Sequence, residues 1–200
     1  MTVQDKSAGA RLDRRDVLKG AAAMGGALLL PASVRAAAPG PRRGGTLRVT
    51  LTQNPGSLDP MTGRNLTDCN VLYTVFDSLI DFEPTTLALK PGLAKAWRFT
   101  DPTTLVLDLV DGIEFHDGTP FNAEAAKFNL DRYRTDPRSN VKPDLASVKA
   151  VEITGKSQVT LHLHSANSGL PAILTNRAGI MVSPAAIKKH GNVDRKPVGT

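Results

Sequence analysis

The stretch that decides the fold is "FHDGTPFNAEAAKFNLDR", which spans Phe115–Arg132. Asp117–Gly118 is a turn dipeptide and bends the chain directly after Phe115. Asn122 is a favourable helix N-cap, and Glu124 puts a negative charge in the first turn, where the helix dipole stabilises it. The stretch therefore predicts a turn followed by a helix that begins just after Asn122.

The helix continues past the quoted stretch, because apolar side chains recur at helical spacing on one face: Ala126, Leu130 and Tyr133. Phe128 falls on the opposite side, so we expect the helix to contact two surfaces. Asp136–Pro137 ends the pattern, since the residue before a proline is biased away from helical angles.

Two alternating segments flank this helix. Residues 97–109, "WRFTDPTTLVLDL", and residues 151–163, "VEITGKSQVTLHL", each place apolar residues at every second position on either side of a turn. Such a pattern is typical of a β-hairpin with one buried face. We expect the two hairpins to form one small antiparallel sheet.

The remaining segments are less regular. "GTLRVTLT" (45–52) alternates like a half-buried strand, and "TDCNVLYTVFDSLI" (67–80) has apolar residues at helical spacing with Thr67 as a candidate cap. Pro84 and Pro91–Gly92 bracket a short loop. Residues 170–191 predict a short helix, a short strand and a second short helix.

The amino-terminal stretch "DRRDVLKGAAAMGGALLL" (13–30) sets two arginines before an apolar run. The run is shorter than the roughly 20 residues that cross a bilayer, but it has the length of a signal-peptide core. "RRDVLK" resembles the twin-arginine export signal, with Asp13 in place of its serine and Val17 in place of its phenylalanine. The alternative is an ordinary amphipathic first helix. Small residues ending at Ala36 suggest cleavage there, and no cysteine follows to take a lipid.

The charge distribution and the cysteine content argue against some classes of function. The net charge is +6, but residues 1–36 hold six basic and three acidic residues, so half of the excess lies in the signal. The rest has no basic cluster interleaved with aromatics, which argues against nucleic-acid binding. A single cysteine, Cys69, excludes an intrachain disulfide and a cysteine-based zinc site.

Five segments together carry a resemblance to a known family: residues 44–60, 75–82, 89–132, 180–191 and 197–200, in one order and spacing. They resemble the start of a family 5 extracellular solute-binding protein, of the class that serves peptide, nickel and related ABC importers. The resemblance covers about residues 44–200, and the quoted 115–132 block is its most specific part.

The resemblance implies an α/β fold like that of type II periplasmic binding proteins: two lobes with an additional small α+β domain, of which only the amino-terminal part is present. The expected parts are a signal peptide (1–36), a flexible leader (37–44), the start of lobe I (45–79), the small domain (80–195) and a return to lobe I (196–200). The protein is expected in the periplasm.

The resemblance also implies reversible binding of a peptide, opine-like solute or metal chelate, without catalysis or cofactor. The expected partners are an inner-membrane ABC permease and the Tat translocase. In the family, the loop after "SLDP" faces the ligand cleft, which gives these candidate ligand-binding residues: Thr62, Gly63, Arg64, Asn65, Leu66 and, in a second region at 139–141, Asn140. An arginine at position 64 favours an anionic ligand. The alternative is an ordinary surface loop.

Other chemistry-bearing residues have simpler interpretations. His162 and His164 lie two residues apart and so share one face of the predicted strand, a spacing that could hold a metal. Their leucine neighbours take the other face, which we expect to be the core side. The two histidines are therefore expected to face solvent. His116 and Asp117 suggest a base and its orienting carboxylate, yet the pair lies in a turn without a recognisable nucleophile. Cys69 near a helix start is expected to be inert. "GGTL" precedes a strand, so it is not a phosphate loop.

The rival hypothesis is a hydrolase exported by the twin-arginine route. That class requires a clustered nucleophile, base or metal set, and the sequence displays none.

Overall fold

The computed structural model describes residues 44–200. The predicted signal peptide and most of the predicted leader lie outside the described residues. Residues 49–200 form one compact unit, while residues 44–48 belong to a separate unit and form neither helix nor strand. No helix in the described range has the length and hydrophobicity needed to span a membrane.

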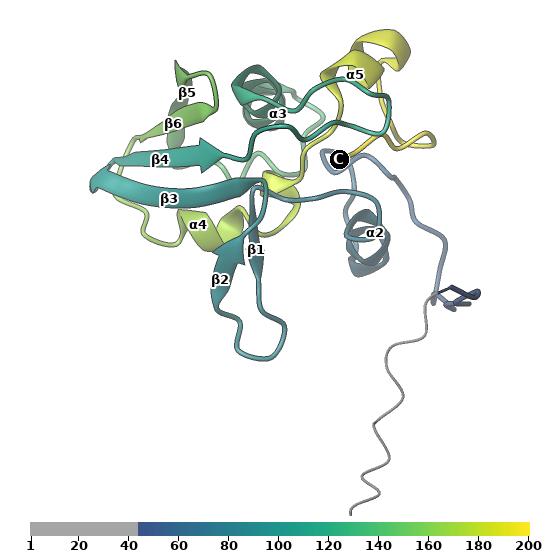
Figure 1. Cartoon of the computed structure of the whole chain (residues 1–200). Helices are drawn as coiled ribbons and strands as arrows, with labels where there is room; N and C mark the ends of the chain where they lie inside the picture. The colour runs from purple at the N-terminus through teal and green to yellow at the C-terminus, as the bar shows by residue number, and fades with distance from the viewer. Residues whose placement is uncertain (1–43) are drawn as a thin grey trace, which may run out of the picture. The chain divides into compact units, whose positions relative to one another are not determined.

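The compact unit is built around a four-stranded antiparallel sheet (Figure 1). Strands β3 (Ala94–Asp101) and β4 (Thr104–Leu109) form one hairpin, and β5 (Val148–Gly155) and β6 (Gln158–Leu163) form the other. The strand order is β3-β4-β6-β5, so the hairpins join through β4 and β6, with Leu107 opposite Val159. The predicted pair of hairpins in a single sheet is confirmed.

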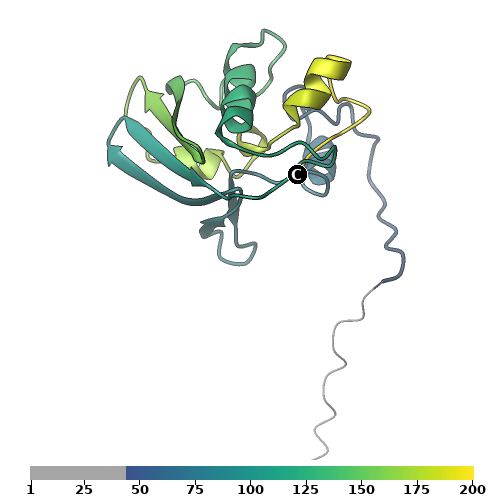
Figure 2. The same cartoon turned by 45° about the horizontal axis from the view of Figure 1, so that its top comes forward.

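Helix α3 (Ala123–Thr135) covers one face of this sheet beside β5 and β6 (Figure 2). Asn122 caps it as predicted, because its side-chain oxygen accepts a hydrogen bond from the backbone N–H of Ala125 at 2.9 Å. The predicted face is buried in the main core, together with the inward leucines and valines of the sheet: Ala126, Leu130, Tyr133, Leu105, Leu107, Leu109, Val159, Leu161 and Leu163. Periodicity therefore identified most of the core.

Short elements complete the unit. They are α2 (Leu66–Leu72), β1 (Ile80–Phe82), β2 (Leu89–Pro91), α4 (Leu170–Ile173), the 3-10 helix η2 (Arg177–Gly179) and α5 (Pro184–His190). A second, smaller core joins α2 to α5 through Leu72, Phe76, Ile180, Val182, Ala186 and Val193. The β1–β2 hairpin was not predicted, because only three residues pair in each strand.

The predicted strand at 45–52 is wrong. These residues form no regular element, and Leu47 and Val49 are 88% and 70% exposed. A strand is stabilised by hydrogen bonds and side-chain pairs with a neighbouring strand. No strand within residues 44–200 pairs with this segment, so its alternating pattern has nothing to pack against.

The predicted helix at 67–80 is shorter than expected and starts earlier. Asn65, not Thr67, caps α2, through a reciprocal capping box with Asp68. The helix ends at Leu72, and Leu79 and Ile80 are carried into the main core by hydrogen bonds to Gly179 and Leu174. The strand predicted near residue 180 is reduced to a single bridge between Ser78 and Ile180.

Candidate functional site

The candidate site is the loop from Met61 to Asp68, which connects the "SLDP" turn to α2. A buried ion pair holds its beginning. Asp59 is fully buried, and its carboxylate accepts hydrogen bonds from both terminal nitrogens of the Arg132 guanidinium, with Nη1 3.0 Å from Oδ1. The same carboxylate accepts from the Met61 N–H, and the Asp59 carbonyl accepts from the N–H groups of Thr62 and Gly63. The loop is thus fixed to α3 at its first residues.

A second carboxylate holds the end of the loop. Asp68 is buried, and it accepts hydrogen bonds from the backbone N–H groups of Gly56 at 2.7 Å, Arg64 at 2.8 Å and Asn65 at 3.3 Å. Burial acts to raise the pKa of Asp68, but these hydrogen bonds outweigh it and lower the pKa below the ordinary value. Asp68 therefore stays ionised and closes the loop into a compact bend.

Two regions that the sequence placed 78 positions apart meet at this loop. The Asn140 side chain donates to the Thr62 carbonyl at 2.7 Å, and the Asn140 N–H donates to the Met61 carbonyl at 2.9 Å. Thr62 also donates through its hydroxyl to Asp194 at 3.0 Å. Asn140 and Thr62 are therefore adjacent, and much of their polar capacity is used in holding the loop.

Some of the predicted ligand-binding residues form hydrogen bonds that hold the loop in place, whereas others are exposed to solvent. Gly63 is buried, and its carbonyl accepts a hydrogen bond from the Arg177 guanidinium, while Asn65 is engaged as the cap of α2. Arg64 and Leu66 are exposed, Leu66 at 76%. None of the ion pairs formed within residues 44–200 includes Arg64. The loop thus presents one guanidinium and one apolar side chain.

The supports Asp59, Arg132, Arg177 and Asp194 were missed by the sequence analysis. Asp59 of "SLDP" and Arg132 of "LDR" both lie in segments that carry the family resemblance, but no local sequence pattern indicates that their side chains form an ion pair. The other acids around the loop are engaged as well, because Asp194 accepts from both Ser57 and Thr62. The carboxylates of Asp59, Asp68 and Asp194 therefore all have internal hydrogen-bond donors.

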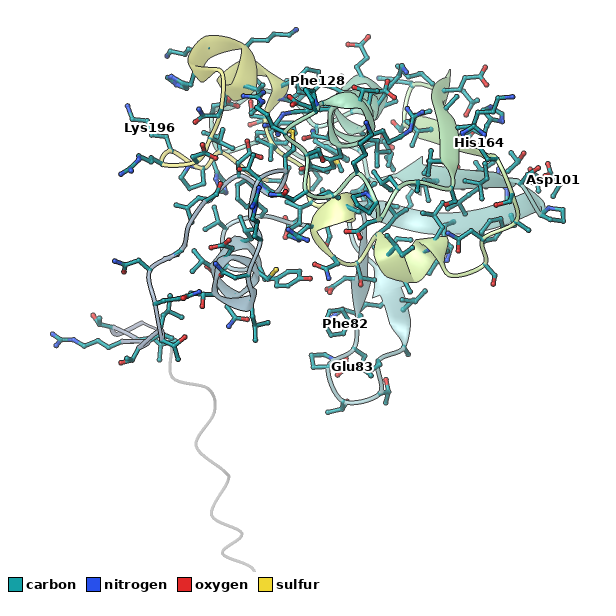
Figure 3. All side chains as sticks on the ribbon, turned by 180° about the vertical axis from the view of Figure 1, so that it is seen from behind. Phe82, Glu83, Asp101, Phe128, His164 and Lys196 are labelled. Atoms are coloured by element: carbon teal, nitrogen blue, oxygen red, sulfur yellow. The ribbon has the colours of Figure 1, made fainter. Side chains whose placement is uncertain are left out.

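His162, His164 and Cys69 lie outside the 61–68 loop. Nε2 of His162 is hydrogen-bonded to Oε2 of Glu152 at 2.8 Å across the β5–β6 pair, and His164 is exposed (Figure 3). In the part of the chain that the structure describes, no three His, Cys, Asp or Glu side chains gather as a metal site. Cys69 is partly buried on α2.

Ser183, His116 and Asp117 lie near one another without forming a triad. Asp117 accepts from the hydroxyls of Thr119 at 2.6 Å and Ser183 at 2.5 Å, and Ser183 in turn caps α5. His116 instead accepts a hydrogen bond from the Gly199 N–H through Nδ1 at 3.2 Å. A nucleophile requires a hydrogen bond to the base that activates it. The predicted turn role of Asp117–Gly118 fits this geometry, with Gly118 at a φ of 76°.

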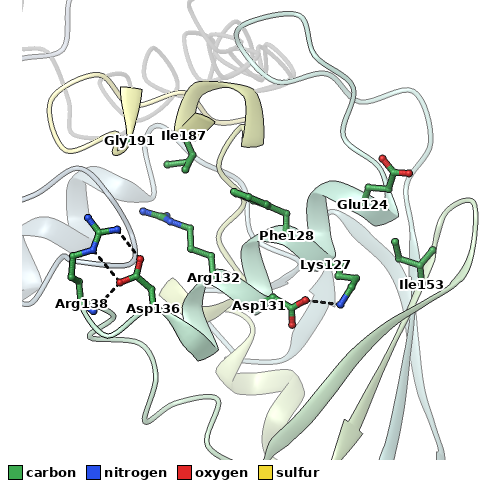
Figure 4. Close-up of a pocket in the computed structure, with 10 residues that line it drawn as sticks. All are labelled: Glu124, Lys127, Phe128, Asp131, Arg132, Asp136, Arg138, Ile153, Ile187 and Gly191. Carbon is green, nitrogen blue, oxygen red and sulfur yellow. Dashed lines mark hydrogen bonds and ion pairs between the residues drawn. The ribbon is translucent and has the colours of Figure 1, made fainter. Parts of the chain in front are cut away.

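A groove of about 580 Å³ runs along the outer side of α3 (Figure 4). Phe128 lines it together with Ile187 of α5 and Ile153 of β5, so α3 does contact a second surface as expected. Lys127 pairs with Asp131, and Arg138 pairs with Asp136, along its wall. Since these charged groups are paired, the groove offers mainly apolar contact.

The fold is that of periplasmic binding proteins. AgaA of A. tumefaciens R10, solved with agropinic acid, superposes with a TM-score of 0.67 at 21% identity, over 74% of this chain and 30% of AgaA. NikZ of Campylobacter jejuni, solved with Ni(L-His), superposes with a TM-score of 0.64 at 23% identity, over 74% of this chain and 30% of NikZ. A dipeptide-binding protein of Pseudoalteromonas sp. SM9913, solved with Met-Leu, superposes with a TM-score of 0.64 at 24% identity, over 74% of this chain and 34% of that protein.

Sequence comparison gives the family. Residues 88–200 match the model of bacterial extracellular solute-binding proteins, family 5 (middle region), and the chain belongs to this family. The glutathione-binding protein GsiB of Escherichia coli K12 is 33% identical over 159 residues, which are 76% of this chain and 30% of GsiB. The chain thus spans about 30% of the length of this curated relative.

The export signal is also found. Residues 11–31 match the model of the twin-arginine translocation pathway signal sequence. Together with an extracellular solute-binding family, this match confirms the predicted export to the periplasm. The predicted domain boundaries stay predictions, as do the ligand contacts of the 61–68 loop.

Proposed function

We propose that this chain is part of a binding protein that captures a small solute in the periplasm and delivers it to an ABC permease. Binding is reversible and involves no chemical step. The Tat translocase exports the protein, and ligand binding favours a closed arrangement of lobes that the permease accepts. Membership of family 5 and the twin-arginine signal support this proposal.

We further propose that the 61–68 loop contributes to the ligand site and takes a solute bearing a carboxylate. The observation that carries this proposal is Arg64, an exposed guanidinium on a loop whose neighbouring carboxylates all accept internal hydrogen bonds. A guanidinium matches the geometry of a carboxylate and binds it in two parallel hydrogen bonds. Leu66 next to it offers apolar contact. Glutathione, Met-Leu and agropinic acid, which the relatives bind, all carry carboxyl groups.

The test is an NMR titration of the 200-residue chain with glutathione, Met-Leu and Ni(L-His). We expect millimolar binding of a carboxylate-bearing ligand, with shifts centred on Thr62–Leu66 and Asn140, and an unchanged ligand spectrum after incubation. Arg64→Glu abolishes the shifts, whereas Lys156→Glu, the same charge change in the β5–β6 turn, leaves them intact. Shifts that spare the loop, or that persist in Arg64→Glu, contradict the loop assignment. Conversion of the ligand contradicts the binding function.

A further inference from the structure

The positive charge that lies outside the signal is concentrated in one short segment. Residues 188–196, "KKHGNVDRK", hold four lysines and arginines and one acid, so they carry a net charge of +3 with the histidine neutral. Residues 37–200 as a whole have the same excess, because residues 1–36 account for the other half of the +6. The remainder of residues 37–200 is therefore balanced in charge.

The basic side chains of this segment face solvent, whereas its acid is engaged by the compact unit. We call the exposed set the basic corner: Lys188, Lys189, His190, Arg195 and Lys196. None of the ion pairs within residues 44–200 includes a member of it. The Asp194 carboxylate instead accepts hydrogen bonds from the hydroxyls of Ser57 at 2.7 Å and Thr62 at 3.0 Å. The positive charges are thus left without a partner in this part of the chain.

The fold brings the two halves of the basic corner to one side of the unit. Helix α5 ends at His190, and Gly191 reverses the chain at a φ of 77° with its N–H bonded to the Ile187 carbonyl. The Leu58 N–H then donates to the Asp194 carbonyl at 3.1 Å, which fixes the following residues on the 57–62 turn. Figure 3 shows Lys196 on the same outer side of the unit as α5.

A local role explains only part of the basic corner. Cations in the last turn of a helix stabilise its dipole, so Lys188 and Lys189 have a structural use. Arg195 and Lys196 lie beyond the helix cap, where the effect of the dipole has faded. The stability of α5 therefore does not account for these two residues.

We propose that the basic corner adsorbs to the surface of a bilayer that contains anionic phospholipids. The chain is exported to the periplasm, a compartment bounded by membranes. Each lysine or arginine close to an anionic bilayer strengthens adsorption about fivefold, so four of them together strengthen it by several hundredfold.

The side chains of the corner favour a lipid surface over other polyanions. Nucleic-acid sites combine basic groups with aromatic rings that stack on bases, and residues 188–196 contain no Phe, Tyr or Trp. Protein interfaces are centred on buried apolar or aromatic anchors. The exposed large apolar side chains of residues 44–200 all lie outside residues 184–200. The contact is therefore electrostatic, and the corner lies on the headgroups without entering the bilayer.

Vesicle sedimentation tests the adsorption. At low salt, the 200-residue chain is expected to bind vesicles of phosphatidylcholine and phosphatidylglycerol in equal parts more tightly than vesicles of phosphatidylcholine alone. Arg195→Gln combined with Lys196→Gln is expected to weaken binding to the anionic vesicles about 25-fold. Salt at about 0.5 M removes the difference between the two kinds of vesicle, because it shortens the screening length to a few ångströms.

The matched control is Lys142→Gln combined with Lys156→Gln. Both lysines are exposed, and the double change removes the same charge from another part of the unit. It is expected to alter binding less than about twofold. The signal is present in every variant, so its own affinity for lipid cancels in the comparison. Equal losses in the two double variants, or no loss in either, overturn the proposal, because adsorption then depends on net charge or on the signal.

Fluorescence quenching identifies the face that meets the lipid. In a Cys69→Ser background, Asn192→Cys in the basic segment and Ala88→Cys on the β1–β2 hairpin each carry a fluorophore at an exposed position. Lipids with a spin-labelled headgroup are expected to quench the fluorophore at position 192 and to spare the one at position 88. Equal quenching at both positions contradicts the proposed orientation. Quenching that survives high salt contradicts the electrostatic contact.

Discussion

The Asp59 carboxylate, fully buried, is held by the guanidinium of Arg132 from a helix 73 positions further along the chain. This pair fastens the "SLDP" turn to α3 and sets where the 61–68 loop begins. Within residues 44–200, the Asp59 carboxylate accepts from the Arg132 guanidinium and the Met61 N–H, and Asp59 is the ion-pair partner of Arg132. The pair is therefore costly to break, although it is not a large net source of stability.

Loss of Arg132 is expected to be strongly destabilising. Arg132→Ala leaves the Asp59 charge buried without its partner, and such losses cost about 3–5 kcal/mol of the free energy of unfolding. Urea unfolding followed by circular dichroism measures the change. Arg138→Ala is the control, because it breaks an exposed ion pair with Asp136 that is worth about 0–1 kcal/mol. Equal effects of the two substitutions contradict the role given to Asp59.

Asp68 predicts an acid-sensitive loop. Its folded-state pKa lies below the ordinary value of 3.8, so the ionised carboxylate contributes stability that is fully present above that value. This contribution is lost as the pH falls through the lowered pKa. Asp68→Asn is therefore expected to reduce stability at pH 6 and to narrow the difference between pH 6 and pH 3. Urea midpoints of both proteins at both pH values measure this, and parallel curves count against the assignment.

Loss of the side-chain cap of α2 is expected to reduce the free energy of unfolding by less than loss of Arg132 does. Asn65→Ala removes the side-chain acceptor for the Asp68 N–H, which lies at 2.9 Å, and is expected to cost about 1 kcal/mol. Leu66→Ala, a change at an exposed neighbour, serves as the reference in the same thermal unfolding series. A larger loss for Thr67→Ala than for Asn65→Ala places the cap at Thr67 instead.

Position 179 requires glycine because the backbone carbonyl of Leu174 leaves no room for a Cβ there. A Cβ at this position is placed 1.8 Å from the Leu174 carbonyl oxygen, so Gly179→Ala forces η2 away from α4. We expect a loss of about 1–3 kcal/mol, the usual cost of overpacking a core. Gly56→Ala is the matched control, since its Cβ meets Asp68 only at 3.8 Å. Comparable unfolding midpoints for the two variants exclude this steric reason.

The failures of the sequence analysis have a common cause. Residues 45–52 alternate as a strand does, but within the described residues no neighbouring strand supplies the hydrogen bonds. The α2 segment has helical spacing through Leu79, yet tertiary hydrogen bonds to Gly179 and Leu174 draw Leu79 and Ile80 out of the helix. A pattern records which face is apolar, whereas the available partner decides the backbone conformation.

The sequence alone determined the two hairpins, α3 with its Asn122 cap, the main core and the export signal. These features depend on alternation, helical spacing and capping, all of which are local. Only the tertiary structure decided how the candidate loop is held, because its supports Arg132, Asn140 and Arg177 lie 73, 78 and 114 positions from their partners. Contacts at such separations leave no periodic trace, since they arise only when the packed sheet and helices bring distant residues together.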